Sequence, residues 1–145
     1  MSLLDQAVET IQSWGPERKK DRARCLKLLR QTAGRMDRGI AVWEAFLENA
    51  PESGDRFTTV LWIGAKPARK LQALYLENKA AAVELTKLTG VRFKDSLSLA
   101  EDLDIVQPYN QLEPGESGSD RAKSAIRTMT DRKQNIEAAV ASFGG

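Results

Sequence analysis

Apolar and small residues recur at alternating spacings of three and four along three stretches of the chain. This period keeps one stripe of a helix facing its neighbours over several turns, so each stretch predicts an amphipathic helix. The three seams are Leu26, Leu29, Ala33, Met36, Ile40, Trp43 and Leu47; Leu71, Leu74, Asn78, Ala81, Leu85 and Leu88; and Ala122, Ile126, Met129, Lys133, Ile136, Val140 and Phe143. The pattern predicts an all-α protein built from packed helices.

Helix caps and helix breakers set the bounds of the predicted elements, which span about residues 3–13, 16–49, 56–89, 98–106 and 120–142. Gly15-Pro16 separates the first two helices. The third helix is expected to kink just before Pro67, and two helices broken at Gly64-Ala65-Lys66 are the alternative. Gly90 follows this helix where a left-handed residue is favoured, and Ser98 begins a capping box that predicts the short helix.

Together these elements predict one domain over residues 1–145, folded as an antiparallel four-helix-type bundle with a short additional helix near 98–106. Part of a seam could instead pair between two copies of the chain, so a homo-oligomer is an alternative. The sequence contains no apolar run long enough for a transmembrane helix, and its first residues do not resemble a secretory signal. A cytoplasmic location is therefore expected.

The chain contains no histidine, which narrows the chemistry that it can perform. Histidine is the commonest metal ligand and the commonest acid–base group near neutral pH. We therefore expect no enzyme activity, no catalytic residues, no metal and no cofactor. Glutamates four or seven apart, Glu44 with Glu48 and Glu77 with Glu84, lie off the seams and are interpreted as solvated.

Cys25 is the single cysteine, so no intramolecular disulfide can form. Arg24 beside it could lower its pKa, but without a histidine partner we expect a small residue on the flank of the helix. Gly34 and Gly39 lie beside seam residues, where close approach of another helix or a local bend would explain them.

Asn78 and Lys133 interrupt otherwise apolar seams. For Lys133 we favour the edge of the bundle, where its long side chain can reach water. For Asn78 two interpretations remain open: a buried residue that fixes helix register, or a position at the edge.

The charge is distributed unevenly, although the whole chain carries only +2. Residues 16–38 contain nine basic and three acidic residues, a net charge of +6, whereas residues 95–120 contain seven acidic residues and no basic one. The basic stripe, residues 18–38, could bind phosphates or an acidic partner. The alternative is a solvated helix face, partly neutralised by the acidic segment.

These observations favour a non-enzymatic protein-interaction module, an adaptor, regulatory or inhibitory bundle with an unidentified protein partner. The alternative is binding of nucleic acid or an anionic lipid membrane surface through the basic stripe, although no aromatic residues are interleaved with it. The candidate contact residues for a partner or an anion are Trp14, Arg18, Lys19, Arg22, Lys27 and Arg30.

Overall fold

The computed structural model describes residues 3–49, 65–93 and 118–143. Its elements are α1 (Leu3–Gln12), a 3-10 turn η1 (Pro16–Arg18), α2 (Lys19–Asn49), α4 (Ala65–Thr89) and α6 (Gly118–Ala141). All the regular structure in these three ranges is helical, which confirms the predicted all-α bundle. The short helix expected near 98–106 and the first part of the helix expected over 56–89 lie outside the described residues.

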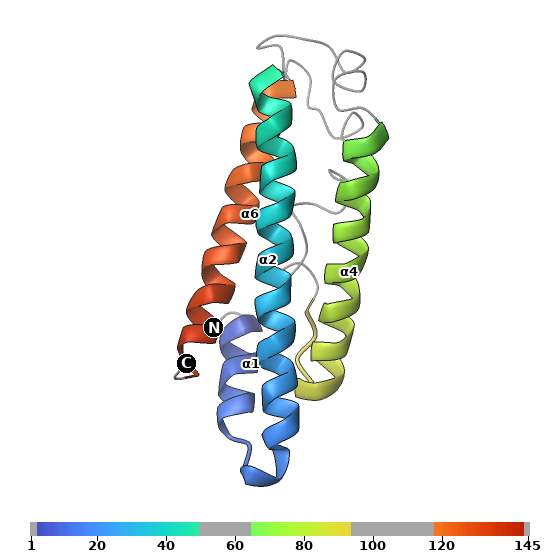
Figure 1. The fold of residues 1–145 in the computed structure, drawn as a ribbon. Helices are drawn as coiled ribbons and strands as arrows, with labels where there is room; N and C mark the ends of the chain where they lie inside the picture. The colour runs from blue at the N-terminus through green and yellow to red at the C-terminus, as the bar shows by residue number, and fades with distance from the viewer. Residues whose placement is uncertain (1–2, 50–64, 94–117, 144–145) are drawn as a thin grey trace.

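Helix α2 is the centre of the bundle, and it packs against α6 on one side and α4 on the other (Figure 1). The chain runs in one direction along α2 and in the opposite direction along α1, α4 and α6. Consequently α4 and α6 are parallel to each other, while each is antiparallel to α2. The short helix α1 contacts both α4 and α6 at the end of the bundle where α2 begins.

The helix ends follow the local sequence signals. Pro16 opens a 3-10 turn in which the Arg18 amide donates to the Gly15 carbonyl at 3.0 Å, so the helix predicted from residue 16 becomes regular at Lys19. Gly90 has a φ of +77° and its amide donates to the Thr86 carbonyl at 2.8 Å. This geometry confirms the predicted left-handed end of α4.

Two adjacent lines of residues are buried along α2, because this helix has a neighbour on each side. One line is the predicted seam, which includes the buried residues Leu29, Ala33, Met36 and Trp43. The second line follows the same spacing one residue earlier, and consists of Cys25, Leu28, Thr32, Arg35, Gly39 and Phe46. Cys25 is therefore a core residue and does not lie on the flank of the helix, as the sequence had suggested.

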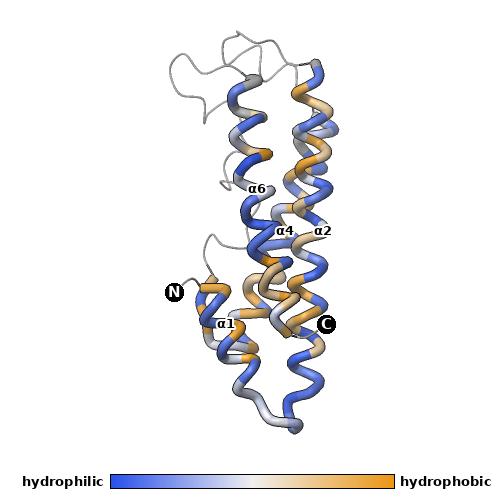
Figure 2. The backbone as a smooth tube through the Cα atoms, turned by 90° about the vertical axis from the view of Figure 1, so that its left-hand side faces the viewer, coloured by the Kyte–Doolittle hydropathy of each residue, from blue (hydrophilic) through white to orange (hydrophobic). Residues whose placement is uncertain are grey.

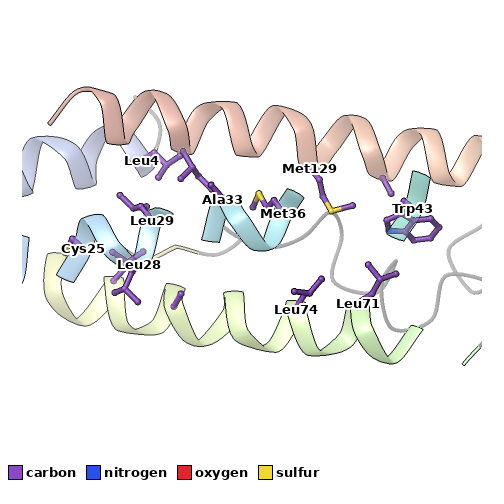
Figure 3. Packing of buried hydrophobic residues seen from close by; sticks show 14 of the residues in the cluster. Leu4, Cys25, Leu28, Leu29, Ala33, Met36, Trp43, Leu71, Leu74 and Met129 are labelled. Carbon is purple, nitrogen blue, oxygen red and sulfur yellow. The ribbon is translucent and has the colours of Figure 1, made fainter. Parts of the chain in front are cut away.

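The core joins residues of the four α-helices that the structure describes. Apolar and polar positions alternate along each helix in Figure 2, as amphipathic helices require. Met129 points from α6 into the space between the helices, and Leu71 and Leu74 point into it from α4 (Figure 3). Trp43 is fully buried, with Phe46 packed edge-on at a ring separation of 5.7 Å.

The structure also tests what the sequence predicted for Lys133 and Gly34. Lys133 is partly exposed and its Nζ lies 2.6 Å from Asp37 and 3.3 Å from Glu137, which confirms a place at the edge of the bundle. At Gly34, a Cβ atom added to the backbone would meet nothing within 4 Å. Close approach of another helix therefore does not explain this glycine, contrary to one of the two explanations that the sequence suggested.

Candidate functional site

Arg18 and Trp14, two of the candidate contact residues, bind each other. The guanidinium carbon of Arg18 lies 3.7 Å from the centre of the Trp14 ring, a cation–π contact. Arg18 Nε also donates to Asp21 Oδ2 at 3.0 Å, and Nη2 donates to the Leu88 carbonyl at 3.1 Å. Arg18 therefore connects the start of α2 to the end of α4.

Arg22 and Arg24 also form hydrogen bonds to other parts of the same chain. Arg22 Nη2 donates to the Phe143 carbonyl at 3.3 Å, next to the end of α6. Arg24 holds both carboxylate oxygens of Glu84, with Nε to Oε2 at 2.7 Å and Nη2 to Oε1 at 3.0 Å. This hydrogen-bonded pair lowers the pKa of Glu84 and raises the pKa of Arg24. These arginines fasten α2 to α6 and α4.

Five other basic residues of the stripe are exposed on the surface of α2, whereas a sixth, Arg35, is buried. Lys20, Lys27 and Arg38 are separated by seven and eleven residues, so they share one line on the surface of α2. Lys19 and Arg30, eleven apart, lie on a neighbouring line. All five side chains are exposed. The structure thus divides the basic stripe into arginines that hold the bundle together and an outward basic face.

A buried polar cluster joins α2 to α4 (Arg35, Asn78 and Thr32). Arg35 is 8% exposed and Asn78 is 0% exposed. Arg35 Nε donates to Asn78 Oδ1, and Nη2 lies 3.4 Å from Thr32 Oγ1. The Thr32 hydroxyl in turn donates to the Leu28 carbonyl at 2.8 Å. Asn78 therefore lies in the interior, which excludes the edge position and agrees with a role in helix register.

A groove of about 270 Å³ lies along the junction of α2 and α4, and Arg35 of this cluster is one of the residues that line it. It is lined by Arg24, Leu28, Gln31, Arg35, Glu77, Ala80, Ala81 and Glu84. Arg35 Nη1 lies 3.9 Å from Glu77 Oε2, a separation too long for a hydrogen bond. Burial lowers the pKa of Arg35, and the Glu77 charge partly opposes this shift. The groove therefore has a buried cation at its base and paired charges along its rim.

A second pocket, of about 310 Å³, lies between α2 and α6. It is lined by Arg30, Ala33, Gly34, Asp37, Glu137 and Val140. Its two acidic side chains both pair with Lys133, and the hydrogen bond that Lys133 donates to Asp37 is the largest cause of the raised pKa of Lys133. The charges at this pocket therefore balance one another.

The outer face of α4 carries an exposed apolar line, formed by Ala73, Leu76, Ala80 and Val83. These residues follow the same alternation of three and four as the buried seams, on the side of α4 turned away from the core, and Ala80 also borders the groove between α2 and α4. Leu76 is 53% exposed and Val83 is 50% exposed, and they are the only large hydrophobic residues exposed in the described part of the chain. A line of this kind is suited to packing against another helix.

Three side chains that the sequence analysis considered for chemistry, Cys25, Glu44 and Glu48, lie in the described part of the chain. Burial and the neighbouring Asp21 charge raise the pKa of Cys25 to about 11, so its thiol is protonated at neutral pH. Glu44 and Glu48 are both exposed. Over residues 3–49, 65–93 and 118–143, no group of three or more acidic or cysteine side chains is placed to hold a metal ion.

Sequence reasoning missed both the α4 face and the buried arginine. The signal for the α4 face was a second line of spacing three and four, from Ala73 to Val83, on the opposite side of the helix from the predicted seam. For Arg35, the signal was the apolar line at Cys25 and Leu28, which the same spacing extends through Thr32 to Arg35.

Comparison of the chain with protein-family models, with curated proteins and with solved structures finds no significant match. Among the helices that the structure describes, none has both the length and the apolar character needed to cross a membrane.

Proposed function

We propose that this protein is a non-enzymatic interaction module that docks a helix of another protein on the outer face of α4. The observation that supports this function is the exposed apolar line, in which Leu76 and Val83 are half exposed at helical spacing. Packing such a line against a partner removes apolar surface from water, which is the main driving force of protein association. Adaptor, regulatory and inhibitory roles all use a surface of this kind.

The shape of the line indicates what the partner helix presents. Ala73 and Ala80 alternate with Leu76 and Val83, so small and large side chains follow each other along the helix. Large apolar side chains of the partner, three or four residues apart, would fill the positions left by the two alanines. The partner is therefore an amphipathic helix with bulky residues such as leucine or phenylalanine on its apolar face.

A second copy of α4 fits this line less well than a different helix does. In a parallel pair the alanines face each other and leave the interface underpacked. In an antiparallel pair centred near residue 78 the alanines face larger residues, but Lys79 and Glu77 each lie beside their own counterparts. Because like charges at such positions are unfavourable, neither self-pairing satisfies both packing and charge.

Site-specific photo-crosslinking in source cells tests this proposal. A photoreactive amino acid is placed at position 80, within the apolar line, and at position 134 on the exposed side of α6 as the matched control. We expect a discrete protein adduct from position 80 and none from position 134, with the crosslinked peptide mapping to an amphipathic helix. The adduct should disappear when Leu76→Lys is added and remain when the exposed Gln134→Lys is added.

Adducts that form equally from both positions, or that persist with Leu76→Lys, would overturn the proposal. An adduct of the chain with itself would identify a homo-oligomer, and sedimentation of the purified protein would then show a concentration-dependent dimer. Fractionation of the same cells tests the cytoplasmic location that the sequence predicts.

A second candidate function is binding of nucleic acid or an anionic membrane through the outward basic face. It is favoured by the five exposed basic residues Lys19, Lys20, Lys27, Arg30 and Arg38. Reversing the charge of Lys20 and Lys27 tests it, because Arg18 and Arg22 bind within the bundle and changing them would perturb the fold. Binding to duplex DNA or phosphatidylserine vesicles should weaken steeply with salt and with this double change.

A further inference from the structure

We propose that the groove between α2 and α4 is a carboxylate-binding site built on Arg35, and that Glu77 loosely occupies it when no ligand is bound. The ligand is the carboxylate of a small organic acid or of an acidic side chain. This site does not rest on the docking of a helix at α4 and is tested separately.

Arg35 has donors to spare at the base of the groove. A guanidinium carries five N–H donors in a planar fork. Nε donates to Asn78 and Nη2 is near Thr32, whereas Nη1, among the residues that the structure describes, has only the contact with Glu77 at 3.9 Å. The Arg35 side chain is held in place by its buried partners, so a ligand would meet a cation that is already oriented.

Glu77 is a weak occupant of the position that a ligand carboxylate would take. Its side chain is 58% exposed, and its nearest oxygen lies beyond hydrogen-bonding distance from Arg35. Arg24 and Glu84, by contrast, form two short hydrogen bonds across the same groove. Glu77 can therefore turn into water without breaking a hydrogen bond to Arg35, and a closer carboxylate can replace it.

The charges around the groove favour a carboxylate over a phosphate. Arg24 and Arg35 are balanced by Glu77 and Glu84, so the lining has no formal net charge. Exchanging Glu77 for an external carboxylate keeps this balance, whereas a phosphate dianion would add negative charge next to Glu84. A volume of about 270 Å³ accommodates a small acid or a single side chain.

Nuclear magnetic resonance titration of the ¹⁵N-labelled full chain with sodium acetate tests the site, with chloride replaced at constant ionic strength. We expect the Arg35 Nε–H signal to shift and to saturate. The variant Glu77→Gln removes the internal competitor and should lower the acetate Kd at least threefold. The matched control Glu48→Gln, another exposed glutamate, should leave the Kd unchanged.

Further arms of the titration identify the ligand and can overturn the proposal. A blocked glutamate, N-acetylglutamic acid amide, that binds more tightly than acetate would indicate a side chain as the natural source, and the reverse order would indicate a small acid. Equal Kd values for the parent, Glu77→Gln and Glu48→Gln proteins would refute the site. Tighter binding of inorganic phosphate than of acetate at the Arg35 signal would refute its carboxylate specificity.

Discussion

The guanidinium of Arg18 stacks on the ring of Trp14, with 3.7 Å between the guanidinium carbon and the ring centre. Both residues are among the candidate contact residues that the sequence offers for a partner or an anion. Their contact gives each of them a structural role at the turn between α1 and α2. A substitution at either position that weakens partner binding could therefore act by destabilising the fold, without removing a direct contact to the partner.

Arg18→Ala should lower the free energy of unfolding by about 1 to 2 kcal/mol, from a lost cation–π contact and a lost hydrogen bond to the Leu88 carbonyl. Urea denaturation followed by circular dichroism measures this change. The neighbouring Lys19 is exposed and has no ion pair within the described residues, so Lys19→Ala should change stability by less than about 0.5 kcal/mol. Equal effects of the two substitutions would contradict a structural role for Arg18.

Asn78→Ala should destabilise the protein by about 1 to 3 kcal/mol, because it leaves the buried Arg35 Nε–H without its acceptor. The double variant Arg35→Met, Asn78→Leu should lose less than the sum of its two single changes, since it removes both polar partners together. A double-mutant cycle on unfolding free energies tests this coupling. Additive effects would show that the two side chains do not depend on each other.

The helices could be predicted because their apolar spacing is a local property of the sequence. The seams at Leu71–Leu88 and Ala122–Phe143 indeed face the core, and even Lys133 lies where its interruption of the pattern suggests. The burial of Thr32 and Arg35 could not be predicted from this spacing, because a polar residue on a helix is ordinarily assigned to the solvent side. The burial of Arg35 depends on a partner, Asn78, that lies 43 residues further along the chain, and Thr32 is buried beside Arg35.

The candidate sites were harder to predict than the helices, because they too depend on contacts between residues that are far apart in the sequence. Whether a cation is available to a ligand depends on which acceptors the fold brings beside it. Arg24 meets Glu84 from a helix 60 residues away, whereas Lys27, one turn further along, meets solvent. The distribution of charge along the sequence therefore located the basic stripe. It could not show which arginines bond to other helices and which basic residues are exposed to solvent.

Cys25 should react with thiol reagents far more slowly in the native protein than in urea. Its pKa is raised to about 11, so at pH 8 it holds about a hundredfold less thiolate than at its ordinary value, and it is also fully buried. Between about pH 9 and 11 the unfolded chain loses this proton first, so stability should fall as the pH rises through that range. Labelling by a chromogenic disulfide reagent measures the rate, and rapid native labelling would contradict this prediction.

The same chemical change, glycine to alanine, should have opposite effects at Gly34 and Gly90. Gly34 lies inside α2 where an added Cβ meets nothing within 4 Å, so Gly34→Ala should raise the free energy of unfolding by about 0.5 to 1 kcal/mol through helix propensity. At Gly90 the space is equally open, but its φ of +77° is unfavourable for alanine, and Gly90→Ala should cost about 1 to 2 kcal/mol. Chemical denaturation of both variants separates steric room from backbone conformation. A destabilising Gly34→Ala would mean that α2 needs flexibility or a neighbour at this position, as a local bend or a partner beside the α2–α6 pocket would require.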